Sequence, residues 1–299
     1  MQWRLILDDK HDAYKNMAVD ESILQYTVSS STATPTLRFY QWTCPSISLG
    51  RFQNLEQEIN LENCLQDKVP VVRRPTGGRA VYHNSELTYS LIIPDKYTAI
   101  PTNITESYKV ISSAFVKGLK LLGINAELEK PSAEVRSQKS EVRKLTTEDR
   151  SKKLEVKNPK SEIRNPKSAT ASPLCFASTS RYEVTVNGKK LIGSAQRRIQ
   201  NAMLQQGSIL LDYDPRKEQR YFLVNPGTDS EFMANCVTAI NKHLPEPVNL
   251  ETLINHLIQG FAKEFRVEFE VGTLSKPEQK LSESLLTEKY LTDAWNKHR

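Results

Sequence analysis

The sequence has no long apolar run. No stretch of about eighteen consecutive apolar residues, the length that crosses a bilayer, occurs in the chain. The segment Met1–Asp9 alternates like a strand that two acids interrupt, and it contains no apolar segment of the kind found in signal peptides. These absences exclude a membrane partner and predict a cytoplasmic protein.

Cysteine is scarce and scattered. The four cysteines, Cys44, Cys64, Cys175 and Cys236, form no C-x-x-C pair, and no histidine lies at zinc-finger spacing from them. The pattern predicts reduced thiols, with no disulfide framework and no metal site. Three of them, Cys44, Cys64 and Cys236, have the sequence surroundings of ordinary packed or turn residues.

Positive charge is in excess, but one tract holds most of it. The formal net charge is +6; residues 131–172 contain eleven Lys or Arg and six Asp or Glu, and the remaining residues sum to +1. The tract has no glycine and no aromatic residue, and Val156–Glu162 is followed by the similar Ile163–Ala169. It predicts a disordered basic insertion. A nearly neutral folded body argues against a nucleic-acid partner, although the insertion itself could recruit nucleic acid or an acidic protein instead of being a solvated expansion.

Helices and strands are mixed along the rest of the chain. Asp12 is placed to cap a helix through Leu24, and Gly123 to end a helix that begins near Ile104. Asn187-Gly188, between two strand-like segments, predicts a hairpin. The other expected elements are strands at 36–42, 46–49, 69–73, 80–82, 87–93, 203–211 and 267–271, and helices at 250–265 and from Pro277. Several hairpins with few β-α-β units predict an α+β fold with a mixed, largely antiparallel sheet flanked by helices.

The most informative segment runs from Val71 to His83, with the sequence VVRRPTGGRAVYH, and continues to Ser90. Its two glycines permit a tight bend or the close approach of a ligand, and its β-branched and aromatic residues supply apolar walls. The segment fits either a hairpin turn with a solvated basic rim or the wall of a narrow slot for a chain-like substrate. The candidate binding residues in it are Arg73, Arg74, Gly77, Gly78, Arg79, Ala80 and His83. His83 fits two roles, lining the slot or completing a hydrogen-bond network at the end of a strand.

Two residues outside this segment could take part in chemistry. Cys175 lies in a loop between the basic tract and the predicted hairpin, where it is either an inert small hydrophobe or a reactive thiol. Lys189 and Lys190 point to opposite faces of a strand, and Lys190, next to Leu191, is the one expected to face inward, unless both lysines are solvated. The small residues that follow, Gly193, Ser194 and Ala195, leave the space that the floor of a pocket requires.

Five motifs in this order resemble those of the lipoate-attachment enzymes. They are NMAVDE at 16–21, LRFYQW at 37–42, SLGRFQ at 48–53, the arginine and glycine segment, and GKKLIGSAQ at 188–196. That family comprises lipoate-protein ligases and octanoyltransferases and is related in fold to biotin-protein ligases. The resemblance covers most of residues 1–270. It implies a catalytic domain over 1–275, interrupted by the insertion at 131–172, and a C-terminal helix at 276–299.

Two details resemble the cysteine-dependent octanoyltransferases of that family. Cys175-Phe176, fifteen positions before Lys190, is similar to their nucleophile and to the lysine that lowers its pKa. Gly77-Gly78-Arg79 is similar to their turn, where ATP-dependent ligases usually have a third glycine. The insertion directly before Cys175 departs from the family pattern.

The resemblance implies acyl transfer by a monomer that needs no cofactor. Cys175 takes an octanoyl group from octanoyl-acyl carrier protein and passes it to a lysine of a lipoyl domain, such as glycine cleavage H protein. Backbone amides at 77–78 and 193–195 are placed to stabilise the oxyanions. The arginines at 73, 74 and 79 are suited to orient the pantetheine arm or the acidic carrier.

Three other functions stay open. One is an ATP-dependent lipoate-protein ligase, in which Lys190 contacts the phosphate of a lipoyl adenylate and Cys175 is dispensable. Another is an amidotransferase that moves octanoyl from the H protein to other lipoyl domains. The third is a non-catalytic module that holds an acyl or biotinyl domain, and the presence of both Cys175 and Lys190 speaks against it.

Overall fold

The computed structural model describes residues 1–129, 182–223 and 230–297, which all belong to one compact unit. The expected insertion at 131–172 and the candidate nucleophile Cys175 lie outside the described residues. In the part of the chain that the structure describes, no helix is both long and apolar enough to cross a membrane.

The main sheet has eight strands in the order β11-β1-β2-β6-β10-β9-β8-β7. The bounds are β1 Gln2–His11, β2 Thr36–Trp42, β6 Glu86–Pro94, β7 Glu127–Leu128, β8 Val184–Val186, β9 Lys189–Ile199, β10 Ala202–Leu210 and β11 Glu268–Val271. The pairs β11–β1 and β1–β2 are parallel, and all other pairs are antiparallel. The predicted mixed, largely antiparallel sheet is confirmed.

A second sheet has three strands in the order β4-β3-β5. Its strands are β3 Ser46–Leu49, β4 Val71–Arg73 and β5 Val81–His83. β4 and β5, which bracket the arginine and glycine turn, both pair with β3. The turn therefore lies at one end of this small sheet.

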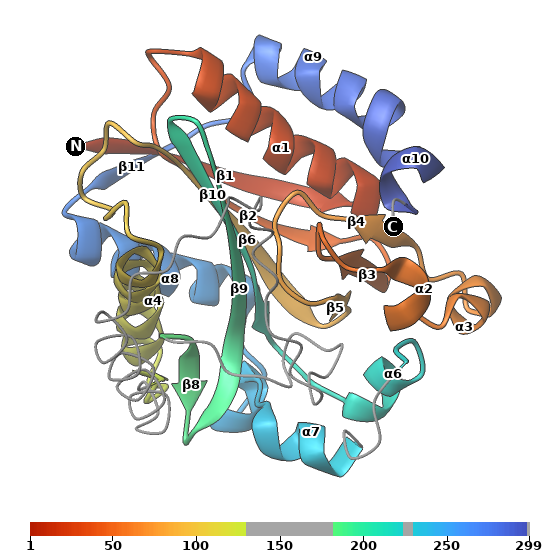
Figure 1. Ribbon diagram of the computed structural model, residues 1–299. Coiled ribbons are helices and arrows are strands. Elements are labelled where there is room, and N and C mark those ends of the chain that lie inside the picture. The colour runs from red at the N-terminus through yellow and green to blue at the C-terminus, as the bar shows by residue number, and fades with distance from the viewer. Residues whose placement is uncertain (130–181, 224–229, 298–299) are drawn as a thin grey trace, which may run out of the picture. The chain divides into compact units, whose positions relative to one another are not determined.

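Helices cover both faces of the main sheet (Figure 1). On one face lie α1 (Ala13–Ser29) and α9 (Lys276–Leu285), and on the other lie α4 (Ile104–Leu121) and α8 (Leu250–Phe265). The remaining helices are short: α2 Leu55–Glu58, α3 Leu61–Gln66, α6 Pro215–Gln219, α7 Ser230–Cys236, the 3₁₀ helix η2 Ile240–His243, the π-helical turn η3 Leu286–Tyr290 and α10 Asp293–Asn296. The expected C-terminal helix is thus divided into α9, η3 and α10.

Side-chain caps explain where the long helices begin. The side chains of Asp12, Asn103 and Asn249 accept hydrogen bonds from backbone N–H groups in the first turns of α1, α4 and α8. Ser275 and Glu278 form a reciprocal capping box at the start of α9. The predicted starts near Asp12, Ile104 and Asn249 are confirmed.

The larger hydrophobic core lies between the main sheet and the pair α4 and α8. Phe115 of α4 and Phe261 of α8 stack edge to face with ring centroids 4.9 Å apart. The two helices approach closely at Gly118 and Gly260, because a Cβ at Gly260 would lie 2.8 Å from the Gly118 Cα. Glycine is required there so that the backbones can pack directly.

One expectation about the main sheet was wrong. We expected Asp8 and Asp9 to interrupt the first strand, but β1 continues through them to His11. The pairing of β1 with β2 shifts register between Leu7 and Lys10, and the Asp8 carboxylate accepts a hydrogen bond of 2.8 Å from Arg38. The irregular pairing and the arginine accommodate the acids inside the strand.

Candidate functional site

A cavity lies where the two sheets meet beneath α1. Most of its exposed lining is apolar. The lining residues are Met17, Tyr40, Trp42, Ser48, Arg74, Val81, His83, Thr88, Gly193, Ser194, Ala195, Gln206, Gly207 and Ser208. A concave, mostly apolar cavity with a few converging polar groups is typical of a small-molecule site.

A buried network around His83 forms one side of the cavity. The two ring nitrogens contact Glu86 Oε1 and Ser48 Oγ, each at 2.7 Å, and the ring stacks on Trp42 at a centroid distance of 3.9 Å. Glu86 Oε1 also accepts hydrogen bonds from Thr88 and Ser208. Burial alone raises the pKa of Glu86, but the charge of His83 and these hydrogen bonds lower it below its usual range. His83 therefore both lines the cavity and belongs to a hydrogen-bond network.

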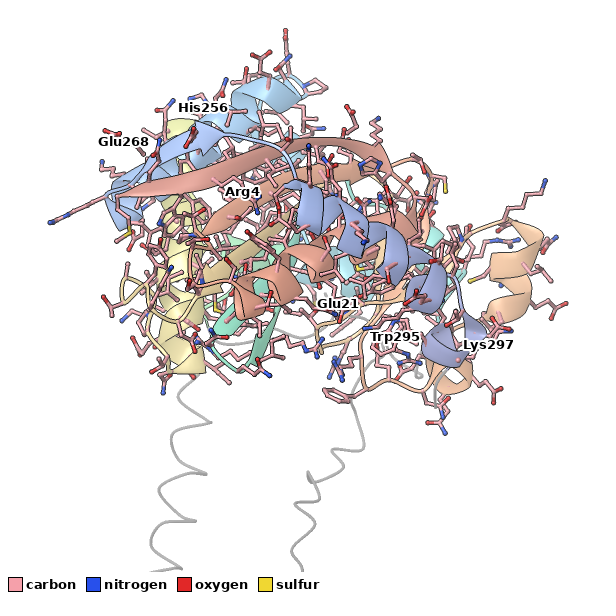
Figure 2. All side chains as sticks on the ribbon, turned by 90° about the horizontal axis from the view of Figure 1, so that it is seen from above. Arg4, Glu21, His256, Glu268, Trp295 and Lys297 are labelled. Carbon is pink, nitrogen blue, oxygen red and sulfur yellow. The ribbon has the colours of Figure 1, made fainter. Side chains whose placement is uncertain are left out.

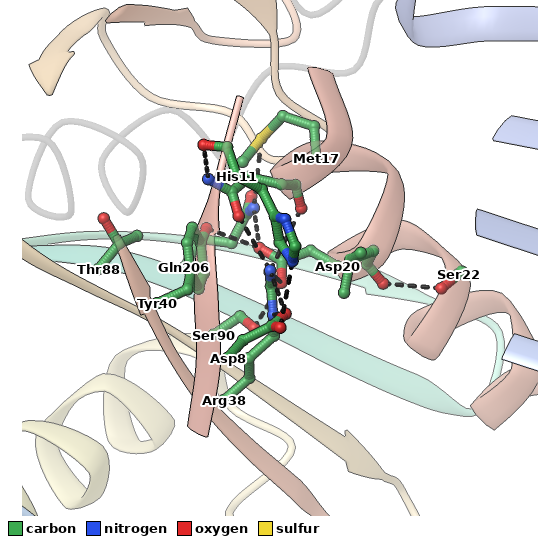
Figure 3. A network of polar contacts seen from close by, with 12 residues as sticks. Asp8, His11, Met17, Asp20, Ser22, Arg38, Tyr40, Thr88, Ser90 and Gln206 are labelled. Atoms are coloured by element: carbon green, nitrogen blue, oxygen red, sulfur yellow. Dashed lines mark hydrogen bonds and ion pairs between the residues drawn. The ribbon is translucent and has the colours of Figure 1, made fainter. Parts of the chain in front are cut away.

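A second buried network joins α1 to the cavity (Figure 3). Asp20 of α1 accepts hydrogen bonds from Arg38 at 2.7 Å, Tyr40 at 2.9 Å and Ser90 at 2.7 Å. Gln206, which lines the cavity, donates a further bond of 2.7 Å to Asp20. The network fixes the helix to three strands around an otherwise costly buried carboxylate.

Hydrogen bonds from the Arg74 side chain stabilise the arginine and glycine turn. The guanidinium donates to the backbone carbonyls of Ser48, Gly77 and Arg79 at 2.6 to 3.1 Å. Gly78 has a φ of +86°, and a Cβ there would lie 2.9 Å from Arg74 Nη2 and 3.5 Å from the Ala195 Cβ. Only glycine fits this turn without strain, and the turn packs against the edge of the cavity at Ala195.

Arg73 has a different environment from Arg74. Its side chain is buried and donates to the carbonyls of Gly50, Arg51 and Gln53 on one side and of Trp295 and Asn296 on the other. These bonds join the turn to the C-terminal segment. The structure thus places the Arg73 guanidinium among backbone carbonyls and outside the cavity lining.

The predicted binding residues divide into two groups. Arg74, His83, Gly193, Ser194 and Ala195 line the cavity together. Arg73, Gly77, Gly78, Arg79 and Ala80 do not line it; Ala80 is fully buried in the core beneath the small sheet. The substrate roles of both groups stay predictions.

Lys190 is the inward-facing lysine of the predicted hairpin. Its side chain is only 1% exposed and pairs with Glu183 at 2.7 Å. Lys189 is half-buried and donates to the carbonyl of Ala234. Asn187 and Gly188 both have positive φ, as a tight two-residue hairpin turn requires. Sequence reasoning missed Glu183, although an acid just before the first hairpin strand is a visible signal for a partner of a buried lysine.

None of the cysteines that the structure describes lines the cavity. Among the described cysteines, Cys44 is exposed and Cys64 is buried, and neither these nor Cys236 lines the cavity. Burial, with Asp67 nearby, raises the pKa of Cys64 to about 11, and burial also raises the pKa of Cys236. Neither is a poised nucleophile. The described residues also contain no cluster of three His, Cys, Asp or Glu side chains that could hold a metal ion.

Several cavity residues were absent from the sequence prediction. Met17, Tyr40, Trp42 and Gln206 come from α1, β2 and β10. Three of them lie in segments that carried the family resemblance, which was the available signal. Gln206 lies in a strand without a motif, and only the pairing of β10 with β9 brings it beside Ala195.

The fold and the site define a class of enzymes that handle lipoyl groups. The catalytic-domain model of lipoyl protein ligases A and B matches residues 12–262. The structure is similar to lipoate-protein ligase A bound with ATP, with a TM-score of 0.73 and 22% identity over 99% of both chains. It is also similar to the bipartite lipoate protein ligase of Thermoplasma acidophilum, with a TM-score of 0.72, 23% identity and coverage of 99% of this chain and 96% of the other. These two likenesses show the fold.

Closer relatives are similar over their whole length. The octanoyltransferase LipM of Brevibacillus brevis is 36% identical over 100% of this chain and 99% of its own. The octanoyltransferase LipM of Bacillus subtilis is 35% identical over 99% of this chain and 98% of its own. The chain belongs to the lipoyl protein ligase A/B catalytic-domain family.

Proposed function

We propose that the protein is an acyltransferase that moves an octanoyl group onto a lysine of a lipoyl domain during protein lipoylation. The observation that carries this proposal is the full-length similarity to enzymes named octanoyltransferase, at 34 to 36% identity and 98 to 100% coverage of this chain. The predicted nucleophile and lysine lie within the same aligned length.

The cavity supports an acyl substrate. Its apolar residues, among them Met17, Trp42 and Val81, suit a hydrocarbon chain, because apolar surface that leaves water is stabilised by roughly 25 cal/mol per Å². Small residues at 193, 194 and 207 contribute to its lining. The cavity thus offers an acyl chain an apolar environment.

Cys175 is the proposed nucleophile. Its thiolate attacks the thioester carbonyl of the donor, a new carbon–sulfur bond forms, and the carrier thiol leaves with a proton. The amine of the acceptor lysine then attacks this enzyme thioester, an amide forms, and the Cys175 thiol is released. Neither step needs ATP. Exchange of one thioester for another changes the free energy little, and formation of an amide from a thioester is downhill.

Lys190 is the proposed partner of that thiolate. A fixed ammonium stabilises a nearby thiolate, and burial strengthens the effect. Glu183 holds the Lys190 ammonium at 2.7 Å, and Cys175 lies eight positions before Glu183 in the sequence. The ion pair therefore supports a positioned lysine, which follows the proposed nucleophile by fifteen positions in the sequence.

Backbone amides at two places are proposed to stabilise the oxyanion of each tetrahedral intermediate. One is the Gly77-Gly78 turn and the other is the segment from Gly193 to Ala195. The two approach each other at Gly78 and Ala195. This proximity supports a joint role at the edge of the cavity.

The proposed donor is octanoyl-acyl carrier protein, and the proposed acceptor is a lipoyl domain such as glycine cleavage H protein. The T. acidophilum lipoylation system consists of a bipartite lipoate protein ligase of the same fold and its E2 lipoyl domain. Acceptance of such a domain is therefore consistent with the family.

Intact-mass measurement tests the function and the nucleophile together. The protein is mixed with octanoyl-acyl carrier protein without ATP, and its mass is recorded before and after hydroxylamine. We expect a hydroxylamine-labile octanoyl adduct that Cys175→Ala abolishes and that the matched variant of an exposed thiol, Cys44→Ala, retains. ATP-dependent lipoylation by Cys175→Ala with no adduct on the wild type would instead establish a ligase.

A further inference from the structure

Two cations pair with one carboxylate beside the arginine and glycine turn, and a third cation lies near them. Glu21 of α1 pairs with Lys289 at 2.6 Å and with Arg197 at 3.5 Å, and it accepts a hydrogen bond of 2.5 Å from Tyr290. The third cation, Arg51, lies 5.8 Å from the ring of Trp295, which Lys289 approaches to 3.8 Å. Figure 2 shows Glu21 and Trp295 near each other beside the C-terminal segment. We call Arg51, Arg197 and Lys289 the cation cluster.

The cation cluster has more positive charge than its own carboxylate neutralises. Burial and the charge of Arg51 lower the pKa of Arg197, although Glu21 raises it. Burial also lowers the pKa of Lys289; Glu21 raises it, and both arginines lower it further. Like charges held this close repel one another, and a bound anion would offset the repulsion.

One donor in the cluster lacks an acceptor. The Nη1 atom of Arg197 is buried and makes no hydrogen bond to any described residue, although it lies 3.5 Å from the Glu21 carboxylate. A buried unsatisfied N–H is costly, and here the donor is charged. An anionic ligand oxygen would satisfy it.

The cluster adjoins the proposed acyl cavity. Arg197 lies two residues beyond Ala195 on β9, so both side chains point to the same face of the strand, the face that lines the cavity. Arg51 follows β3, and its backbone N–H donates to the carbonyl of Thr76 in the turn. A chain-like substrate with its acyl end in the cavity could place a charged group at the cluster.

We propose that Arg51, Arg197 and Lys289 bind the phosphate of the donor's phosphopantetheine arm. The inference rests on the proposed transfer from an acyl carrier. In such a donor, the phosphopantetheine arm that carries the thioester also carries a permanent negative charge, its phosphodiester. Guanidinium groups bind phosphate oxygens through paired, charge-assisted hydrogen bonds. Arg73 and Arg74, by contrast, donate to several backbone carbonyls.

The test compares two donors that differ only in the phosphate. Transfer is measured from octanoyl-phosphopantetheine and from octanoyl-pantetheine. We expect Arg197→Gln to raise KM for the phosphorylated donor about tenfold or more, with kcat within about twofold, and to leave KM for the other donor unchanged. Arg51→Gln should act in the same direction.

The matched control is Arg198→Gln, which removes the same charge from the adjacent residue. Arg198 points to the opposite face of β9, where it pairs with Asp95 at 3.5 Å and donates to the carbonyl of Pro101. It should leave both KM values unchanged. Arg197→Lys, which keeps the charge, should restore part of the discrimination and guards against misfolding as the cause.

An equal rise in KM for both donors in Arg197→Gln would contradict the proposed phosphate site. A raised KM for the acceptor domain alone would contradict it as well. Binding is measured separately by calorimetry with phosphopantetheine and pantetheine, neither of which carries an acyl group. The wild type should prefer the phosphorylated compound, and Arg197→Gln should remove the preference. If no transfer occurs from either donor, the proposed function fails, while the calorimetric comparison still decides the phosphate site.

Discussion

Glu218 is a buried acid whose ionisation should limit stability at and above neutral pH. The carboxyl accepts a hydrogen bond of 2.6 Å from Tyr213. Burial raises its pKa to about 7; the charge of Glu86 adds to the rise, while the Tyr213 bond and Lys190 oppose it. An unfolded glutamate has a pKa of about 4.3, so the folded protein binds this proton more tightly.

The sign of the pH effect follows from that difference. Stability from this group is fully present below the unfolded pKa and is lost as the pH rises to about 7. Glu218→Gln keeps an acceptor for Tyr213 and removes the charge. It should raise the free energy of unfolding at pH 8 by roughly 1–3 kcal/mol and change it little at pH 4.5.

Urea unfolding of the wild type and Glu218→Gln at both pH values checks this prediction. Glu283→Gln, on the exposed side of α9, is the matched control and should show no such difference. A loss of stability of equal size at both pH values would show that the carboxyl acts through its hydrogen bond alone.

The sequence predicted the general location of the arginines of the turn but not the contacts of their side chains. The motif placed Arg73, Arg74 and Arg79 near the site, and Arg74 does line the cavity. The partners of Arg73 lie as far as 223 residues away in the sequence, so no local pattern shows that its side chain is committed to backbone carbonyls. Arg197 was missed for the same reason, because its neighbours Glu21 and Lys289 come from distant helical segments.

At the scale of elements, alternation of apolar residues and capping residues predicted most helices and strands. The strands at 36–42 and 46–49 and the helix at 250–265 have the predicted bounds. Their pairing was not predictable in this way. β1 lies between β2 and β11, and the pairing with β11 joins residues near 3 and 269, a contact that depends on the whole fold.

The contact between α4 and α8 should be intolerant of a single methyl group. A Cβ at Gly260 would lie 2.5 Å from the Gly118 N and 2.8 Å from its Cα. These are backbone atoms, so the helices must separate. We expect Gly260→Ala to lower the free energy of unfolding by about 1–3 kcal/mol, although alanine is the better helix former.

Chemical denaturation measures this loss. Gln259→Ala, at an exposed position of α8, is the control for a changed helical residue outside the contact. Unchanged or increased stability of Gly260→Ala would show that helix propensity outweighs the close approach and that the two helices can move apart at little cost.

At the scale of the molecule, Arg73 joins the small sheet to the C-terminal segment. Its backbone N–H donates to the Asn296 side chain at 2.9 Å, its carbonyl accepts from the Trp295 indole at 2.8 Å, and its guanidinium binds two more carbonyls of the same segment. α10 therefore supports β4, and β4 leads directly into the arginine and glycine turn. Trp295 also lies against two members of the cation cluster.

Removal of residues 293–299 should consequently affect both stability and substrate binding. The deletion leaves buried Arg73 donors without acceptors, at about 1–3 kcal/mol for each unsatisfied group, and we expect a clear fall in melting temperature. Because the turn loses its support, KM for the acyl donor should rise, and limited proteolysis should cut the chain near the turn. Lys297→Ala, at an exposed residue of the same segment, should change none of these. A truncated protein with the wild-type melting temperature and KM would show that β4 and the turn are held by the small sheet alone.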